Sequence, residues 1–283
     1  MLPATYLVFG DLHGRVLPAF RLAQAWSREN GVALAGLLQV GDLGEFQSRS
    51  RFDQGAQSER RKHSLEGGFG LVAQPSQEAD KIFGEEPSTP TMWFTAGNHE
   101  KYDELRMKQR RSRLQGASFL VDAYAKLCCI RDGQIADLRC GLRVGALWGI
   151  DDKAPRARER IPAGGRISRR SAELLSTARF DVLLTHESPR DAVLADHGSE
   201  AIGQLIRKAQ PSFAFFGHYH TTGREIEGDF GTTRVYHLSH LELDSRAEEA
   251  SVGVLTWDGS AGDFAYLDPA WLRTVTRHNW RHR

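Results

Sequence analysis

The chain has 283 residues, of which 40% are hydrophobic and 26% charged, and its formal net charge is +1. This composition is typical of a globular protein with a large core, and the balanced charge excludes a strong overall attraction to polyanions. The apolar runs are far shorter than the roughly 20 residues that span a bilayer, and the N-terminus lacks the features of a secretory signal. We therefore expect no membrane partner and a cytoplasmic location.

The predicted elements repeat one pattern, in which a short apolar run ends at a polar loop. Residues 6–9 are rich in β-formers and stop at Gly10, and a helical pattern follows at residues 17–26. Similar runs that end in such loops occupy residues 36–40, 91–95, 143–148, 180–184 and 213–216. Because ligands of open α/β sheets bind beyond the carboxyl ends of the strands, we expect the residues of these loops to converge.

Two regions depart from this pattern. Residues 45–90 are polar and weakly periodic, which is typical of a functional loop inserted between site-bearing strands. After residue 235, two apolar runs at residues 252–257 and 264–267 are separated by Asp258-Gly259, which predicts an antiparallel hairpin, and a basic tail follows. Because no linker interrupts the chain, we expect a single domain over residues 1–283, with this loop insertion, hairpin and tail.

The loops after the predicted strands carry side chains that can bind metal ions. Singly, each has an ordinary structural explanation, such as turn chemistry or a buried histidine. Their repetition in the same kind of loop favours a shared site made of Asp11, His13, Asp42, Asn98, His186, His218 and His220. Carboxylate, imidazole and amide oxygen without thiolate favour Mn²⁺, Fe²⁺ or Zn²⁺. Two such ions about 3.5–4 Å apart, bridged by Asp42, can assist in-line displacement at phosphorus.

The motifs that carry these residues resemble those of the calcineurin-like metallophosphoesterase superfamily over about residues 6–222. They are Gly10-Asp11-Leu12-His13-Gly14, Gly41-Asp42, Gly97-Asn98-His99-Glu100, Thr185-His186 and Gly217-His218-Tyr219-His220. The resemblance implies a four-layer αββα fold, in which a central sandwich of two mixed β-sheets is flanked by helices. Of the two ions that it implies, one is held by Asp11, His13, Asp42 and His220, and the other by Asp42, Asn98, His186 and His218. His99 is then free of metal and protonates the leaving oxygen.

Two branches of the superfamily can be compared with the chain. Residues 79–90 and 141–150 are similar to lariat RNA debranching enzymes, although those enzymes carry a cysteine where Asp11 stands and have a further C-terminal domain. The serine/threonine phosphoprotein phosphatases continue Gly-Asp with Arg-Gly, whereas Leu43 and Gly44 follow Asp42 here. Protein phosphatase activity is therefore disfavoured.

Basic clusters bear on the substrate. They lie at residues 60–63, 108–113, 156–158, 166–170 and 273–283. Such clusters favour RNA or DNA ends or nucleotides as substrates, and the alternative is that they are solvated faces balanced by acidic residues. We expect a phosphodiesterase, active also on phosphomonoesters, that uses two divalent ions, with Mn²⁺ favoured over Fe²⁺ or Zn²⁺, for hydroxide attack, and His99 as general acid. The alternatives are a catalytically silent metal-binding interaction module and a small-molecule phosphomonoesterase.

Overall fold

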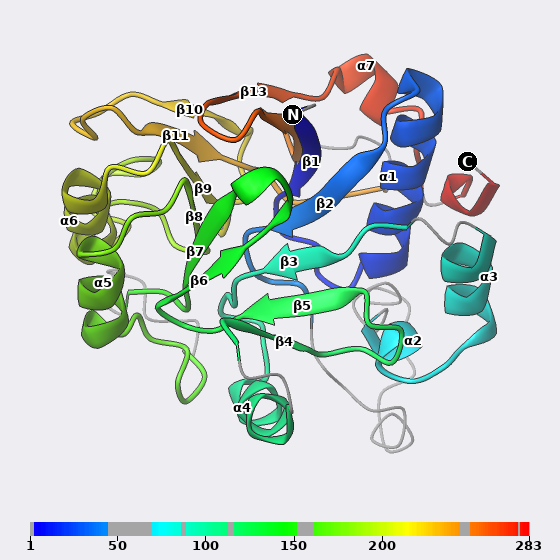
Figure 1. The fold of residues 1–283 in the computed structure, drawn as a ribbon, viewed down its shortest axis with the longest axis horizontal. Coiled ribbons are helices and arrows are strands. Elements are labelled where there is room, and N and C mark those ends of the chain that lie inside the picture. The colour runs from blue at the N-terminus through cyan, green and yellow to red at the C-terminus, as the bar shows by residue number, and fades with distance from the viewer. Residues whose placement is uncertain are drawn as a thin grey trace.

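Two mixed β-sheets form the centre of the molecule, and helices cover their outer faces (Figure 1). The computed structural model describes residues 3–44, 69–85, 89–112, 116–151, 161–243, 250–276 and 278–282. Within these residues the layers follow the order helix, sheet, sheet, helix, which confirms the expected fold class.

The first sheet has seven strands in the order β13-β12-β1-β2-β3-β5-β4. Its strands are β1 (Ala4–Phe9), β2 (Leu34–Gln39), β3 (Met92–Phe94), β4 (Ser118–Leu120), β5 (Leu127–Ile130), β12 (Val252–Trp257) and β13 (Gly262–Tyr266). β1, β2, β3 and β5 run parallel, whereas β4, β12 and β13 are antiparallel to their neighbours. The predicted C-terminal hairpin is confirmed, since Leu255 of β12 pairs with Phe264 of β13.

The second sheet has six strands in the order β10-β11-β9-β8-β7-β6. Its strands are β6 (Gln134–Asp137), β7 (Arg143–Leu147), β8 (Val182–Thr185), β9 (Phe213–Phe216), β10 (Arg224–Ile226) and β11 (Arg234–His237). The four inner strands are parallel, and the edge strands β6 and β10 are antiparallel to their partners. Inner strands β8 and β9 are buried on both faces, as expected of parallel strands in an α/β protein.

The helices of the described residues are α1 (Val16–Asn30), α2 (Gly70–Ala73), α3 (Gln77–Glu85), α4 (Tyr102–Arg111), α5 (Arg169–Ser176), α6 (Glu200–Ala209) and α7 (Pro269–Leu272), with 3-10 turns η3 (Arg139–Gly141) and η4 (Trp280–His282). In Figure 1, α5 and α6 lie on one side of the sandwich and α1 on the other. α1 ends at Gly31, whose positive φ of 63° lets its amide close the last turn on Arg28 O.

Side-chain alternation along the strands divides the core into three clusters. In β1, Leu7 and Phe9 face the α1 side, whereas Tyr6 and Val8 lie between the sheets. The same alternation in β9 directs Phe215 between the sheets and leaves its neighbours to pack with α5 and α6. Both faces of each sheet are therefore covered, so polar side chains are expected mainly at the sheet edges and at the strand ends.

The region expected to be a loop insertion contains helices where the structure describes it. α2 and α3 lie there, and Ile82 and Phe83 of α3 are buried in the core next to α1. The side chain of Gln24 in α1 donates to Ile82 O at 2.8 Å and to Thr89 Oγ1 at 2.9 Å. Residues 45–68 and 86–88 lie outside the described residues.

The basic tail packs against the body of the protein. Trp280 in η4 is 2% exposed and joins the core cluster beside α1. Arg281 pairs with Glu78 of α3, with Nη2 to Oε1 at 2.6 Å. None of the helices seen in the described ranges is long and apolar enough to cross a membrane.

Candidate metal centre

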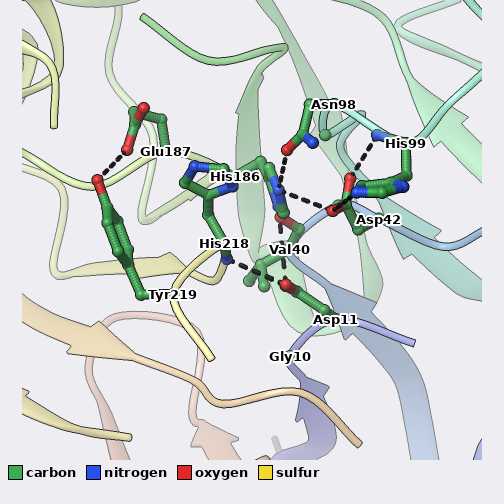
Figure 2. Close-up of polar contacts among 12 residues, drawn as sticks. Gly10, Asp11, Val40, Asp42, Asn98, His99, His186, Glu187, His218 and Tyr219 are labelled. Carbon is green, nitrogen blue, oxygen red and sulfur yellow. Dashed lines mark hydrogen bonds and ion pairs between the residues drawn. The ribbon is translucent and has the colours of Figure 1, made fainter. Parts of the chain in front are cut away.

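The loops that follow five parallel strands bring the predicted side chains together (Figure 2). Loops after β1, β2 and β3 come from the first sheet, and loops after β8 and β9 come from the second. Three mutually close donor groups lie here, within 4.8 Å in each case: Asp11–His13–His220, His13–Asp42–His99 and Asp11–Asp42–His186. The convergence expected from the strand-end pattern is therefore present.

Backbone hydrogen bonds lock the first two loops to each other. The amides of Leu12 and His13 both donate to Asp42 O, at 3.0 and 2.9 Å, and Gly14 N donates to Leu43 O at 2.8 Å. His13 and Asp42 adopt positive φ values of 43° and 51°, a strained conformation for residues with a side chain. The two loops thus form one unit, and the strain is held at the positions where the predicted ligands lie.

Two positions beside the carboxylates require glycine, because the backbone there passes very close to the carboxylate oxygens. A Cβ on Gly217 would lie 2.0 Å from Asp11 Oδ1, and a Cβ on Gly97 would lie 2.3 Å from Asp42 Oδ1. The space is used for hydrogen bonds, because His218 N donates to both Asp11 oxygens at 3.2 Å and His99 N donates to Asp42 Oδ1 at 2.8 Å. The glycines that begin these motifs therefore position the carboxylates.

The deep group of the centre consists of Asp42, Asn98 and His186. His186 has a fully buried side chain, and its Nδ1 lies 3.1 Å from Val40 O. Its Nε2 lies 3.0 Å from Asn98 Oδ1 and 3.2 Å from Asp42 Oδ2. Burial alone would lower the pKa of His186, but Asp42 and Asp11 raise it to about 10. His186 Nε2 thus faces two oxygen atoms, an arrangement that fits a cation bound among these three donors.

The outer group consists of Asp11, His13 and His220. The Nε2 atoms of His13 and His220 face each other at 3.3 Å, and they lie 3.9 and 3.7 Å from Asp11 Oδ2. The His220 side chain is 52% exposed. Burial lowers the pKa of His13, whereas the contact with Asp11 raises the pKa of His220. Two nitrogens and a carboxylate that converge from the loops after β1 and β9 fit a second cation.

Asp11 and Asp42 are buried carboxylates, at 1% and 2% exposure. Among the residues that the structure describes, their ion-pair partners are all histidines. Burial opposes ionisation of both, yet His186 and the other imidazoles hold the pKa of each carboxyl below its ordinary value. Two buried negative charges side by side require neutralisation, which divalent cations supply.

The other two predicted residues lie at the edge of these groups. The His99 side chain is 50% exposed, its Nε2 lies 3.9 Å from Asp42 Oδ2, and its ring meets the His13 ring edge-on at 5.0 Å. His218 belongs to none of the three close donor groups, although its ring contacts that of His186 at 5.0 Å. His99 thus belongs to a close donor group with Asp42 and His13, whereas His218 contacts the centre through the His186 ring.

Glu100 is a functional residue to which the sequence pattern assigned no role. Its fully buried carboxylate accepts hydrogen bonds from Leu43 N and Gly97 N, both at 2.6 Å, and so joins the loops after β2 and β3. Burial and the charge of Asp42 raise the pKa of Glu100 to about 8. Its place in the Gly-Asn-His-Glu motif was a signal, since a carboxylate beside ligands often holds their loops.

Gln39 and Glu187 also support the centre. Gln39, a polar residue inside a buried strand, accepts from Gly41 N at 3.0 Å and donates to Gly10 O at 3.2 Å. Glu187 follows His186 and accepts a hydrogen bond from the hydroxyl of Tyr219 at 2.7 Å (Figure 2). The amide in an apolar strand could have been noticed in the sequence, whereas the Glu187–Tyr219 contact depends on the packing of two loops.

The basic cluster at residues 166–170 lies beside a cleft of mixed charge. Arg166 and Arg169 line a cleft of about 700 Å³ with Lys208, but Glu173 and Glu200 line it too. Residues 60–63 and 156–158 lie outside the described residues. The described part of this cleft therefore combines both signs of charge.

The chain belongs to the calcineurin-like phosphoesterase family, whose model matches residues 4–222. No curated protein sequence matches it. Among solved structures, TT1561 of Thermus thermophilus is 12% identical with a TM-score of 0.51, and the alignment covers 94% of this chain and 100% of that one. GAP50 of Plasmodium is 10% identical with a TM-score of 0.49, over 95% of this chain and 85% of that one. At these identities, the similarity to the Thermus structure shows the fold alone.

Family membership identifies the general class of activity as metal-dependent hydrolysis of phosphoric esters. The Asp and His groups of the loops are arranged for metal binding. Both conclusions agree with the class expected from the sequence motifs.

Proposed function

We propose that the protein is a binuclear phosphodiesterase that hydrolyses nucleotides or nucleic-acid ends and also accepts phosphomonoesters, with Mn²⁺ as the favoured ion. The observation that carries the proposal is that the deep and outer groups lie side by side, because a carboxylate of each approaches the same histidine. Asp11 and Asp42 both approach the buried ring of His186, at 3.7 and 3.2 Å. This arrangement of donors from five loops supports the proposal of two cations rather than one.

In this proposal, one ion is held by Asp11, His13, Asp42 and His220, and the other by Asp42, Asn98, His186 and His218. Two bound divalent ions would neutralise charge on the phosphoryl oxygens and make water a stronger nucleophile near neutral pH. The chain itself keeps the carboxylates ionised through neighbouring imidazoles and fixes the His186 ring through Val40 O.

His99 is the proposed general acid. Its backbone is held by Asp42 Oδ1 while half of its side chain is exposed, so the imidazole can reach a substrate above the carboxylates. Histidine gains and loses protons near neutral pH, which suits protonation of a leaving oxygen. The exposed imidazole beside the buried ligands supports an enzyme over a silent metal-binding module, because a module needs no proton donor.

The proposal is tested by Mn²⁺-dependent hydrolysis of bis-p-nitrophenyl phosphate and p-nitrophenyl phosphate. Faster turnover of the diester is expected, and chelation of the metal should abolish it. A panel of 2′,3′-cyclic nucleotides, 3′-phosphate ends, branched RNA and linear single strands then defines the natural substrate class. Turnover of neither simple ester nor any member of the panel would contradict the proposal.

A further inference from the structure

A histidine outside the predicted set packs against the outer group. His240 lies after β11, and its ring covers the ring of His220, with centroids 4.4 Å apart and an angle of 32° between the planes. His240 is 8% exposed, whereas the His220 side chain is 52% exposed. A buried ring therefore supports one face of the most exposed histidine of the outer group.

His220 needs this support more than the deep ligand does. His186 is held by contacts at both ring nitrogens and has no exposed side-chain surface. The half-exposed His220 has its described polar contacts only through Nε2, toward His13 and Asp11. A partly exposed side chain loses rotamer freedom when it binds an ion, and packing that restricts the ring beforehand reduces this cost.

His240 is itself fixed in place. Its Nε2 lies 3.4 Å from Glu242 Oε2, and Glu242 Oε1 lies 3.9 Å from Arg15 Nη2. On either side in the chain, Ser239 N donates to Ala250 O at 3.1 Å and Leu241 N donates to Asp11 O at 2.8 Å. The loop that carries His240 is thus bound to the backbone of Asp11, a member of the same outer group.

We propose that His240 is a positioning residue, which holds the His220 imidazole in the orientation that binds a divalent cation together with Asp11 and His13. Glu242 fixes the His240 ring in turn. The inference rests on the proposed function, because it takes the outer group to bind a metal ion. Residues that orient metal ligands typically change metal affinity by about 10–100-fold when they are replaced.

The experiment is a Mn²⁺ titration of the whole chain by calorimetry, with electron paramagnetic resonance to distinguish a spin-coupled pair of ions from a single ion. Wild type is expected to bind two ions. His240→Ala should bind one ion with wild-type affinity and the other about 10–100-fold more weakly, and the coupled signal should fall at low Mn²⁺. His240→Phe keeps a stacked ring and should lose less. The matched control His282→Ala removes an exposed histidine of η4 and should behave as wild type.

A purely structural role for His240 would lower stability without affecting one ion selectively. Unchanged affinity for both ions in His240→Ala, or equal weakening of both, would therefore overturn the inference. If His240→Ala does not fold, the same comparison with His240→Phe and Glu242→Gln decides, since each should weaken only one of the two ions. Wild type that binds both ions but hydrolyses no phosphoester would contradict the proposed activity while leaving this test intact.

Discussion

The deep and outer groups of the centre are built differently, although each includes a buried carboxylate. In the deep group, His186 is enclosed by protein and both of its ring nitrogens face oxygen atoms. In the outer group, His220 is half exposed and packs against the neighbouring ring of His240. The fold thus buries the deep group, while His220 of the outer group and His99 keep half of their side-chain surface exposed.

Replacement of the residue between the two groups should have the largest effect. In Asp42→Asn, the amide cannot supply the negative charge expected to join two ions, so we expect hydrolysis to fall by about 10³-fold or more. The measurement is Mn²⁺-dependent turnover of bis-p-nitrophenyl phosphate. Asp263→Asn, at an exposed carboxylate paired with Arg234, is the control and should keep full activity. A loss below tenfold in Asp42→Asn would show that the groups do not share this ligand.

His99→Ala should separate acid catalysis from metal binding. We expect a loss of about 10²–10⁴-fold for esters of poorly acidic alcohols, because such leaving groups need a proton. Esters of p-nitrophenol should lose much less, and Mn²⁺ binding should be unchanged. The control is His197→Ala, at a half-buried histidine in the loop before α6. If His99→Ala instead abolished metal binding, His99 would be a ligand, as its closeness to Asp42 Oδ2 allows.

Glu100→Gln should loosen the loops beneath the deep group. Both carboxylate oxygens accept backbone amides, whereas a glutamine side chain would turn its own N–H donors toward one of them. We expect the free energy of unfolding to fall by about 1–3 kcal/mol, measured by urea denaturation without metal at a pH above the Glu100 pKa of about 8, where the carboxylate is ionised. Glu225→Gln on β10, where that residue is exposed, is the control. Equal stability of Glu100→Gln and wild type would contradict the role of Glu100 in joining the two loops.

Metal binding should depend on pH most strongly through the deep group. The pKa of His186 is raised from 6.5 to about 10, so an ion at Nε2 must displace a proton at neutral pH. Affinity for that ion should rise by about tenfold per pH unit below about pH 10. In the metal-free protein, this histidine contributes stability that is fully present below about pH 6.5 and is lost as the pH rises through about 10.

In contrast, burial lowers the pKa of His13 in the outer group, so an ion that binds there need not displace a proton from this residue at neutral pH. Calorimetric Mn²⁺ titrations between about pH 6.5 and 8.5, in buffers of different ionisation enthalpy, measure the protons released. Binding of both ions without proton release would contradict the difference between the two groups.

The sequence predicted the parts of the site that local pattern determines. Asp11, Asp42 and His186 each follow a buried strand, so strand direction places Asp11 and Asp42 at the carboxyl end of the first sheet and His186 at that of the second. Their meeting also depends on how the two sheets pack. Strands β1, β2 and β9 were predicted because their short apolar runs end in glycine-led loops, and the C-terminal hairpin because Asp258-Gly259 separates two apolar runs.

Other features depend on contacts between distant parts of the chain. The His240 ring packs on that of His220, and the neighbouring Leu241 N donates to Asp11 O; no local pattern predicts these contacts. α3 was missed in the polar region before β3, because it is a short helix with few apolar residues, of which Ile82 and Phe83 are buried only through tertiary packing. Trp280 likewise becomes part of the core only when the tail meets α1.

The central claim is that one chain holds two metal ions joined by Asp42. The most direct test is the metal content of the purified protein, measured by elemental analysis after loading with excess Mn²⁺ and removal of free metal. The expected result is two ions per chain, and one or none in Asp42→Asn. A wild-type protein that retains a single ion, with the same content after Asp42→Asn, would contradict the claim.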